Sequence, residues 1–414
     1  MKLPFFLLFS VTVAFAQTTA PALVTVATGN SITRMSQWDA NNYWHTNSEI
    51  HWANALSGSP MVFSRVSPTT RMDGWGIYGY PGQTLPGILA DLPAQFFTPL
   101  SKASVVPDLV IGNALLENDI AGGATVSDMQ SSLTQWVTTM QQKWPSLRIL
   151  LCTPHLSAYY NTPTLVSNYQ AMRDYILGLD NNATTFVARI DAYEDPMSPG
   201  TPLPGYTDGI HPNAKGSLLL ARTMAQTLSR LGSTWIQPGS DTSANMTFSG
   251  SQPVSGPGVS GTVPTGIHET WGNGTFVATA LNPSFTLQIT TPQLTSYPEL
   301  GAFDMGALSL HAKQISPFLT VQIMSGAANL RSVELQPRLF YGGSKNTFVY
   351  YIQAQGNDVD PNFLDGDTFS FREPPVMAPS GSISAVDIYV QCKMKLAGGT
   401  STVRFVTGGI GVLQ

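Results

Sequence analysis

A change of pattern near residue 233 is the strongest constraint on how this chain folds. Before it, short apolar runs alternate with longer segments that carry apolar side chains at every third or fourth position. The short runs are typical of buried parallel strands, and the longer segments of helices with one apolar face. Their alternation predicts a parallel sheet covered by helices on both faces. The predicted strands cover residues 22–28, 108–116, 147–152 and 186–190, and the predicted helices cover residues 126–144, 165–179 and 217–231.

The sequence pattern after residue 232 is different. Residues 233–265 are rich in Gly, Pro, Ser and Thr and have almost no charge or periodicity, which predicts a flexible or semi-extended linker. Beyond the linker, short runs such as residues 285–290 alternate between apolar and polar side chains. Runs of this kind predict an antiparallel β-sandwich of the jelly-roll type. The predicted organisation is an α/β domain over residues 21–232, the linker, and an all-β domain over residues 266–414.

The first twenty residues predict export. Lys2 gives a positive start, residues 4–15 are apolar, and Ala14 and Ala16 frame a small-residue cleavage site. The apolar stretch is shorter than the roughly 20 residues that span a bilayer, and no later run is long enough. We therefore expect residues 1–20 to be a signal peptide and the mature chain to be secreted or periplasmic, without a membrane span.

The composition argues against several classes of function. Charged residues make up 11% of the chain, and 20 Lys and Arg stand against 25 Asp and Glu. Nucleic-acid binding needs a basic patch, which this balance does not favour. With 43% apolar residues, the chain has ample material for folded cores. Cys152 and Cys392 lie far apart in the sequence, so we expect two buried thiols and no disulfide framework.

Two short motifs of the first domain carry a nucleophile and a base. Ser31 stands in Gly29-Asn30-Ser31, directly after the first predicted strand. Asp208 precedes His211 by three residues, a spacing at which a carboxylate can turn back onto the imidazole Nδ1. Because ligands bind at the carboxyl ends of parallel strands, we expect both motifs at that edge of the sheet. Each motif alone is also compatible with an ordinary turn.

Two further segments offer hydrogen-bond donors for the oxyanion that forms during acyl transfer. Gly82 lies in a Gly-rich loop, where its backbone N–H can approach a substrate closely. Asn118 follows the strand predicted to begin at residue 108, which places its amide at the same edge of the sheet. No group of His, Cys and acidic residues has zinc-binding spacing, and Asp358 and Asp360 lack the Gly and Glu of an EF-hand loop. We expect no metal and no cofactor, and the sequence leaves open only calcium at Asp358 and Asp360 in a geometry other than the EF-hand.

Other histidines compete with His211 for the role of base. His155 follows the predicted strand over residues 147–152 and could contact a substrate. It has no acidic residue at a matching spacing, so we expect no role for it as the base. His45 and His51 flank a Trp-rich segment, and we expect them to pack or to lie at the surface.

In this chain order the four segments resemble the sequence blocks of the SGNH (GDSL-type) hydrolase family. The resemblance covers residues 22–231, about half of the chain. It implies a flavodoxin-like three-layer α/β/α fold and an open, shallow site suited to esters. It also implies the roles of individual residues, namely Ser31 as nucleophile, His211 as base, Asp208 as its acidic partner, and the backbone N–H groups of Ser31 and Gly82 with the side chain of Asn118 as the oxyanion hole.

The sequence departs from the family pattern at two positions. Asn30 stands where the family usually has Asp, and we expect this amide to support the loop and to permit activity. Leu116 stands where the family usually has Gly, and we expect it to reshape the pocket beside Asn118. A second placement of this block, on Gly112 and Asn113, lies within the predicted strand and lacks the following Asp, so we favour Asn118.

These features predict a secreted serine esterase that hydrolyses short acyl groups. Export, a neutral hydroxyl-rich surface and an appended β-sandwich favour O-acetyl groups on a polysaccharide as the substrate. We expect the β-sandwich to bind a glycan or to mediate oligomerisation. The sequence leaves open a lipase-like esterase on simple esters, transfer of the acyl group to a sugar, and a non-catalytic glycan-binding or adhesion protein. The aromatic candidates for sugar contact, which cross-strand packing explains more readily, are Trp271, Tyr341, Tyr350 and Tyr351.

Overall fold

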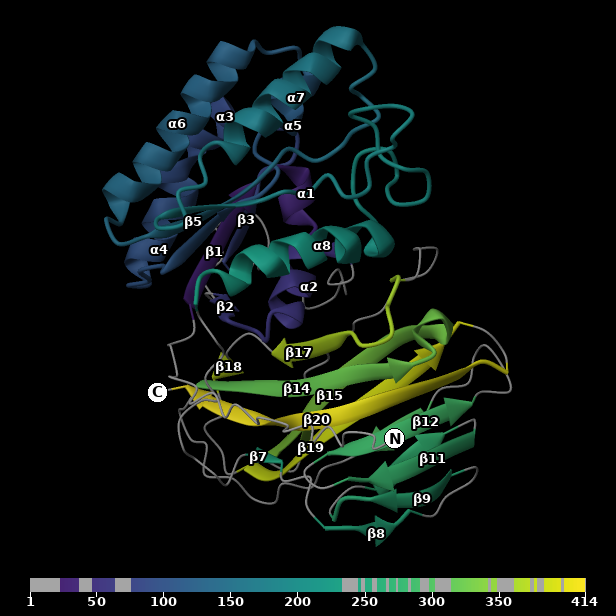
Figure 1. Ribbon diagram of the computed structural model, residues 1–414. Helices are drawn as coiled ribbons and strands as arrows, with labels where there is room; N and C mark the ends of the chain where they lie inside the picture. Colours follow the sequence, from purple (N-terminus) through teal and green to yellow (C-terminus); the bar gives the residue numbers. More distant parts are fainter. Residues whose placement is uncertain are drawn as a thin grey trace, which may run out of the picture.

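The computed structural model consists of an α/β part and a part built of strands (Figure 1). The predicted signal peptide and most of residues 233–249 lie outside the residues that it describes. The described residues are 23–36, 47–63, 76–232, 245–246, 250–254, 259–265, 268–272, 275–281, 284–290, 298–301, 314–341, 344–347, 361–372, 376–377, 383–395 and 398–413.

A parallel sheet of six strands forms the centre of the α/β part. β1 pairs with β4 along one edge, and with β2 and then β3 along the other. β5 and β6 extend the sheet beyond β4. When β2 and β3 are taken as one position, the strand order is that of flavodoxin-like doubly wound folds. The strands are β1 (Leu23–Gly29), β2 (Met61–Phe63), β3 (Ile77–Gly79), β4 (Leu109–Gly112), β5 (Arg148–Cys152) and β6 (Thr185–Ala188).

Helices cover both faces of this sheet, as the sequence predicts. α3, α6 and α7 lie on one side of it, and α2 and α8 pack together on the other (Figure 1). Right-handed crossovers require this division, because the chain first moves from β1 toward β2 and then back past β1 toward β6. The helices are α1 (Ser31–Arg34), α2 (Glu49–Leu56), α3 (Leu85–Asp91), α4 (Thr98–Lys102), α5 (Glu117–Ala121), α6 (Val126–Lys143), α7 (Pro163–Leu177) and α8 (Ala214–Ser229), with a π-helical segment, η2 (Leu92–Phe97).

The prediction of one strand over residues 108–116 is wrong at its carboxyl end. β4 stops at Gly112, and the chain leaves the extended conformation at Ala114, which has a φ of +52°. The carbonyl of Ala114 then accepts a hydrogen bond from the backbone N–H of Asn30. Leu115 and Leu116 are buried and apolar, but they belong to a turn that leads into α5. An apolar run therefore continues past the end of its strand.

The strand-built part contains two sheets, ordered β10-β13-β19-β15-β16 and β17-β14-β20-β12-β11-β9-β8. Apart from the parallel pair β9–β11, the described strand pairs are antiparallel. The jelly-roll arrangement stays a prediction. The strands are β8 (Gln252–Pro253), β9 (Val259–Val263), β10 (His268–Gly272), β11 (Thr275–Ala280), β12 (Phe285–Thr290), β13 (Pro298–Gly301), β14 (Gln314–Ser325), β15 (Leu330–Tyr341), β16 (Ser344–Thr347), β17 (Thr368–Arg372), β19 (Ile383–Met394) and β20 (Thr400–Leu413), with β7 (Asn245–Met246) beside β20, β18 (Val376–Met377) beside β14 and a 3₁₀ turn, η4 (Ala327–Asn329).

The linker predicted over residues 233–265 is partly wrong, because three short strands lie within it. β7 pairs with β20, β8 pairs with β9, and β9 pairs with β11. Val263, at the end of β9, is fully buried. The sequence did not indicate these strands, because Gly and Ser obscure the alternating pattern of this stretch. Gly261 has a φ of +101°, and a Cβ at this position would overlap the carbonyl of Ala278.

The two parts of the chain are in contact. Trp52 of α2 is buried and lies edge-on against the rings of Phe363, Phe369 and Phe371, at centroid distances of 5.8, 5.4 and 6.5 Å. β17, which carries two of these rings, runs beneath α2 in Figure 1. The buried thiols predicted for the two cysteines are confirmed. Among the helices that the structure describes, none is long and apolar enough to cross a membrane.

Candidate active site

Ser31 is the first residue of α1, directly beyond the carboxyl end of β1. Asn30 caps this helix, since its Oδ1 accepts a 2.9 Å hydrogen bond from the N–H of Ile32. The turn brings β1 close to the end of β4. A Cβ at Gly29 would lie 1.6 Å from the carbonyl oxygen of Asn113, so only glycine fits there. The sequence Gly-Asn-Ser therefore sets both the close approach of two strands and the start of the helix.

The structure brings Ser31, His211 and Asp208 together. The Oγ of Ser31 lies 3.0 Å from Nε2 of His211, and Nδ1 of His211 lies 3.1 Å from Oδ2 of Asp208. The other oxygen of Asp208 accepts hydrogen bonds from the backbone N–H groups of Ile210 and His211. Gly209, with a φ of +107°, permits this tight turn. Residues that are 180 positions apart in the sequence thus form one hydrogen-bonded chain.

The protonation pattern of these three hydrogen-bonded side chains suits base catalysis. Partial burial by itself would raise the pKa of Asp208, but hydrogen bonds from the backbone of His211 and Ile210 and from the imidazole outweigh it and lower that pKa below its usual value. The ionised carboxylate accepts the Nδ1–H of His211, which leaves the lone pair of Nε2 directed at the Ser31 hydroxyl. The His211 side chain is 27% exposed and that of Asp208 is 65% exposed, so the site is open to solvent.

Asn118 and the Gly82 loop lie side by side. Nδ2 of Asn118, in the first turn of α5, donates a 2.7 Å hydrogen bond to the carbonyl of Gln83. The next residue, Asp119, accepts a 2.8 Å hydrogen bond from the N–H of Leu85 at the start of α3. Gly82 has a φ of +74°, a conformation that favours glycine. The loop after β3 is therefore tied to the helix after β4.

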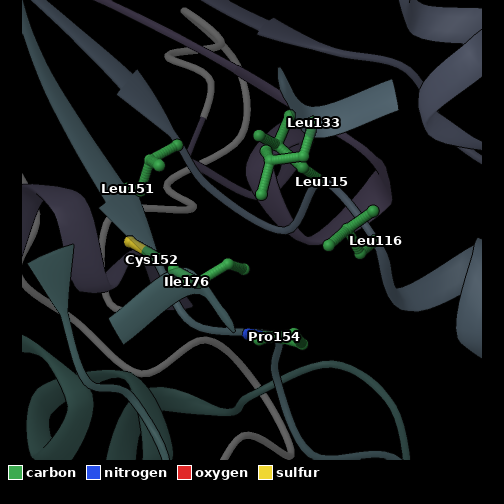
Figure 2. Close-up of a pocket in the computed structure, with 7 residues that line it drawn as sticks. All are labelled: Leu115, Leu116, Leu133, Leu151, Cys152, Pro154 and Ile176. Carbon is green, nitrogen blue, oxygen red and sulfur yellow. The ribbon is translucent and has the colours of Figure 1, made fainter. Parts of the chain in front are cut away.

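Leu116, which stands where the family usually has Gly, lies in the apolar core, and its effect on the pocket beside Asn118 stays a prediction. Its φ of −120° suits any residue, and its side chain is buried. Figure 2 shows it among apolar side chains at a small cavity that leaves no room for a water molecule. The alternative placement on Asn113 puts the amide in the core, where it donates to Glu49. The residues around the cavity are Leu115, Leu116, Leu133, Leu151, Cys152, Pro154 and Ile176.

His155 has acidic partners that lie far from it in the sequence. His155 is fully buried between two carboxylates, with Nδ1 3.1 Å from Glu117 and Nε2 3.0 Å from Glu49. Burial by itself would lower the pKa of His155, but the hydrogen bonds to Glu117 and Glu49 outweigh it and raise that pKa to about 9. No spacing in the sequence indicates this group, because its members are 38 and 106 residues apart.

Some of the remaining candidate residues lie within the described part of the chain, and the others lie outside it. His51 lies in α2, with Nε2 2.7 Å from the carbonyl oxygen of Ser36, and burial lowers its pKa to about 4. Within the described ranges, no group of three or more His, Cys, Asp or Glu residues could hold a metal ion. Trp271 and Tyr341 lie in β10 and β15. The candidates outside the described residues are His45, Tyr350, Tyr351, Asp358 and Asp360.

No protein-family model matches the sequence, and neither does any curated protein. Solved structures with a similar fold include a carbohydrate esterase family 3 protein from Talaromyces cellulolyticus. It is 18% identical, the match covers 50% of this chain and 97% of that one, and the TM-score is 0.34. A member of the lipolytic G-D-S-L family from Veillonella parvula is 13% identical over 50% of this chain and 98% of its own, with a TM-score of 0.34.

Proposed function

We propose that this protein is a serine esterase of the SGNH type that works through an acyl-enzyme on Ser31. The observation that carries the proposal is the hydrogen-bonded chain from Ser31 through His211 to Asp208, with distances of 3.0 and 3.1 Å. Nucleophile, base and orienting carboxylate in this geometry are the parts that activate a serine hydroxyl. The chain lies at the carboxyl edge of the sheet, where doubly wound folds bind ligands.

In the proposed reaction, Oγ of Ser31 attacks the ester carbonyl while Nε2 of His211 takes the hydroxyl proton. Asp208 stabilises the imidazolium that forms. The oxyanion accepts hydrogen bonds from the backbone N–H groups of Ser31 and Gly82 and from the Asn118 amide. His211 then returns the proton to the departing alcohol. Water attacks the acyl group in the second half of the reaction, again with His211 as base, and restores Ser31.

Replacing the nucleophile tests this proposal. We expect Ser31→Ala to lower kcat on a short-chain aryl ester by about 10⁴-fold or more, because only oxyanion stabilisation and binding remain. The variant should also fail to react with a fluorophosphonate probe. Ser229→Ala is the matched control, since that exposed hydroxyl lies at the far end of α8. Full activity in Ser31→Ala would end the assignment.

We propose esters of short acyl groups, and O-acetyl groups on a polysaccharide in particular, as the substrate. The exposure of Asp208 and His211 supports this, because an open site accepts a bulky alcohol without a deep cleft. The neutral, hydroxyl-rich composition and the predicted signal peptide agree with an extracellular glycan. The strand-built part would then bind the same polymer.

A panel of acetylated polysaccharides and of lipid esters distinguishes the substrates. We expect acetate release from at least one acetylated polymer, with a higher kcat/KM than fatty-acid release from any lipid ester. Preference for long acyl chains would instead favour a lipase-like esterase. Recovery of the acetyl group on an added sugar, in place of free acetate, would identify acyl transfer.

A further inference from the structure

A buried ionic cluster lies beneath the proposed nucleophile. It consists of Glu49, His155 and Glu117, whose side chains are 0%, 0% and 5% exposed. Each ring nitrogen of His155 faces a carboxylate oxygen, so the arrangement is satisfied when both nitrogens carry a proton. Glu49 also accepts a 2.7 Å hydrogen bond from Asn113 at the end of β4. The cluster thus joins α2, the end of β4, the loop after β5 and the start of α5.

The cluster is bonded to both catalytic segments. Oε2 of Glu117 accepts a 3.0 Å hydrogen bond from Nδ2 of Asn30, the residue before Ser31. Oδ1 of the Asn30 amide accepts a hydrogen bond from the backbone N–H of Ile32 and so caps α1. Glu117 is in turn the residue before Asn118, the proposed oxyanion donor. The buried carboxylate of Glu117 therefore links the residue before the proposed nucleophile to the residue before the proposed oxyanion donor.

We infer that Glu49, His155 and Glu117 are positioning residues that hold Ser31 and Asn118 in the register needed for acyl transfer. The inference rests on the proposed function. The three residues act through Asn30 and through the first turn of α5. His155 is the only cation of the cluster, and it balances two buried carboxylates that would otherwise repel each other.

The same geometry explains why position 30 is an amide. Asn30 is 1% exposed, and its Nδ2 donates to a buried carboxylate. A carboxylate at this position would keep the helix cap but would put two negative groups within hydrogen-bonding distance. The Asn that departs from the family pattern is therefore required by Glu117 in this chain.

An exchange of charges between the two positions tests the inference. We expect Asn30→Asp and Glu117→Gln each to lower kcat about 100-fold, with KM changed less than about threefold, because misplaced reacting groups slow the chemical step. The double variant has the same total number of carboxylates at positions 30, 49 and 117 as the parent, and it again has one amide and one carboxylate at positions 30 and 117. Its kcat should return to within about tenfold of the parent value, so the two losses are strongly non-additive.

A control separates positioning from simple loss of stability. Asn54 is 7% exposed, and its Nδ2 donates a 3.1 Å hydrogen bond to the carbonyl of Met61, away from the site. Asn54→Asp makes the same chemical change at a comparably buried amide. We expect it to lower the unfolding temperature while kcat per folded molecule stays within about twofold of the parent.

Hydrogen exchange provides a measurement that does not depend on activity. The amides of residues 32–35 and 120–122 should exchange faster in each single variant and return to parental rates in the double variant. Single variants that fail to fold, followed by a folded double variant, also support the inference. Additive losses of kcat with unchanged exchange overturn it. If the parent protein hydrolyses no ester, the proposed function fails, and the exchange rates still decide whether the cluster links the two segments.

Discussion

Gly82 shows how a single backbone conformation can serve the proposed oxyanion hole. Its φ is +74°, and among the described residues, apart from those next to it in the chain, no heavy atom lies within 4 Å of the place where a Cβ would be. The penalty for a side chain at this position therefore comes from the left-handed backbone conformation. A shift of the backbone that relieves this strain would move the N–H that we assign to the oxyanion.

We expect Gly82→Ala to lower the free energy of unfolding by about 1 kcal/mol, the cost of a side chain in this conformation. Its kcat should fall about 10- to 100-fold, because a small displacement of a catalytic donor has a large effect on rate. Gly123→Ala is the matched control, with a φ of +76° and the same open space in the turn after α5. It should lose similar stability and no activity. Equal kcat values for the two variants would remove Gly82 from the site.

At the scale of elements, His155 in the loop after β5 joins two helices through its two carboxylate partners. His155 is bonded to Glu49 at the start of α2 and to Glu117 at the start of α5. Its pKa of about 9 means that the folded protein keeps this proton over a pH range in which the unfolded chain, with an ordinary His pKa near 6.5, has lost it. The stability that His155 gives by joining α2 and α5 therefore depends on pH.

The sign of the effect follows from proton binding. Between pH 6.5 and 9 the folded state binds more protons than the unfolded state, so the contribution of His155 to stability is complete below pH 6.5 and is lost as the pH rises through 9. We expect the free energy of unfolding, measured by denaturant titration, to fall across this range in the parent protein. The fall should be smaller in His155→Gln. If that variant does not fold, an NMR titration of the ring decides, and a pKa below 6.5 would contradict the prediction.

At the scale of the whole molecule, an ion pair supports the contact between α8 and the strand-built part. Arg222 donates to both carboxylate oxygens of Asp367 at 2.6 and 2.7 Å. The Asp367 side chain is 7% exposed, so it relies on this partner. Together with Trp52 and its three phenylalanines, the pair fixes β17 and its preceding loop against the layer formed by α2 and α8.

We expect Arg222→Met to lower the free energy of unfolding by about 3 kcal/mol, since it leaves a buried carboxylate unpaired. Adding Asp367→Asn should recover most of this loss. Arg230→Met is the control, because Arg230 forms a similar pair with Asp180 inside the α/β part, and these side chains are 37% and 22% exposed. A more exposed pair contributes less, about 1 kcal/mol at most. Equal losses in both variants, measured by denaturant titration, would argue against a special role for the Asp367 contact.

The sequence alone determined the features that depend on near neighbours along the chain. Period and length predicted α6, α7, α8 and the central strands, and the three-residue spacing of Asp208 and His211 predicted their hydrogen bond. The rule that parallel strands present their carboxyl ends together also predicted that Ser31 would lie at the same edge. The prediction for Ser31 succeeded because the order of strands in a doubly wound sheet is nearly fixed by right-handed crossovers.

Only the tertiary structure decided which distant side chains share the interior. It ended β4 at Gly112, placed Leu116 in the core, put Trp52 against the rings of the second part, and surrounded His155 with two carboxylates. The partners of His155 are 38 and 106 residues away, and no local period connects them. Burial makes these pairings strong, because an unpaired charge in the interior is costly, and burial is a property of the folded chain that no short stretch of sequence records.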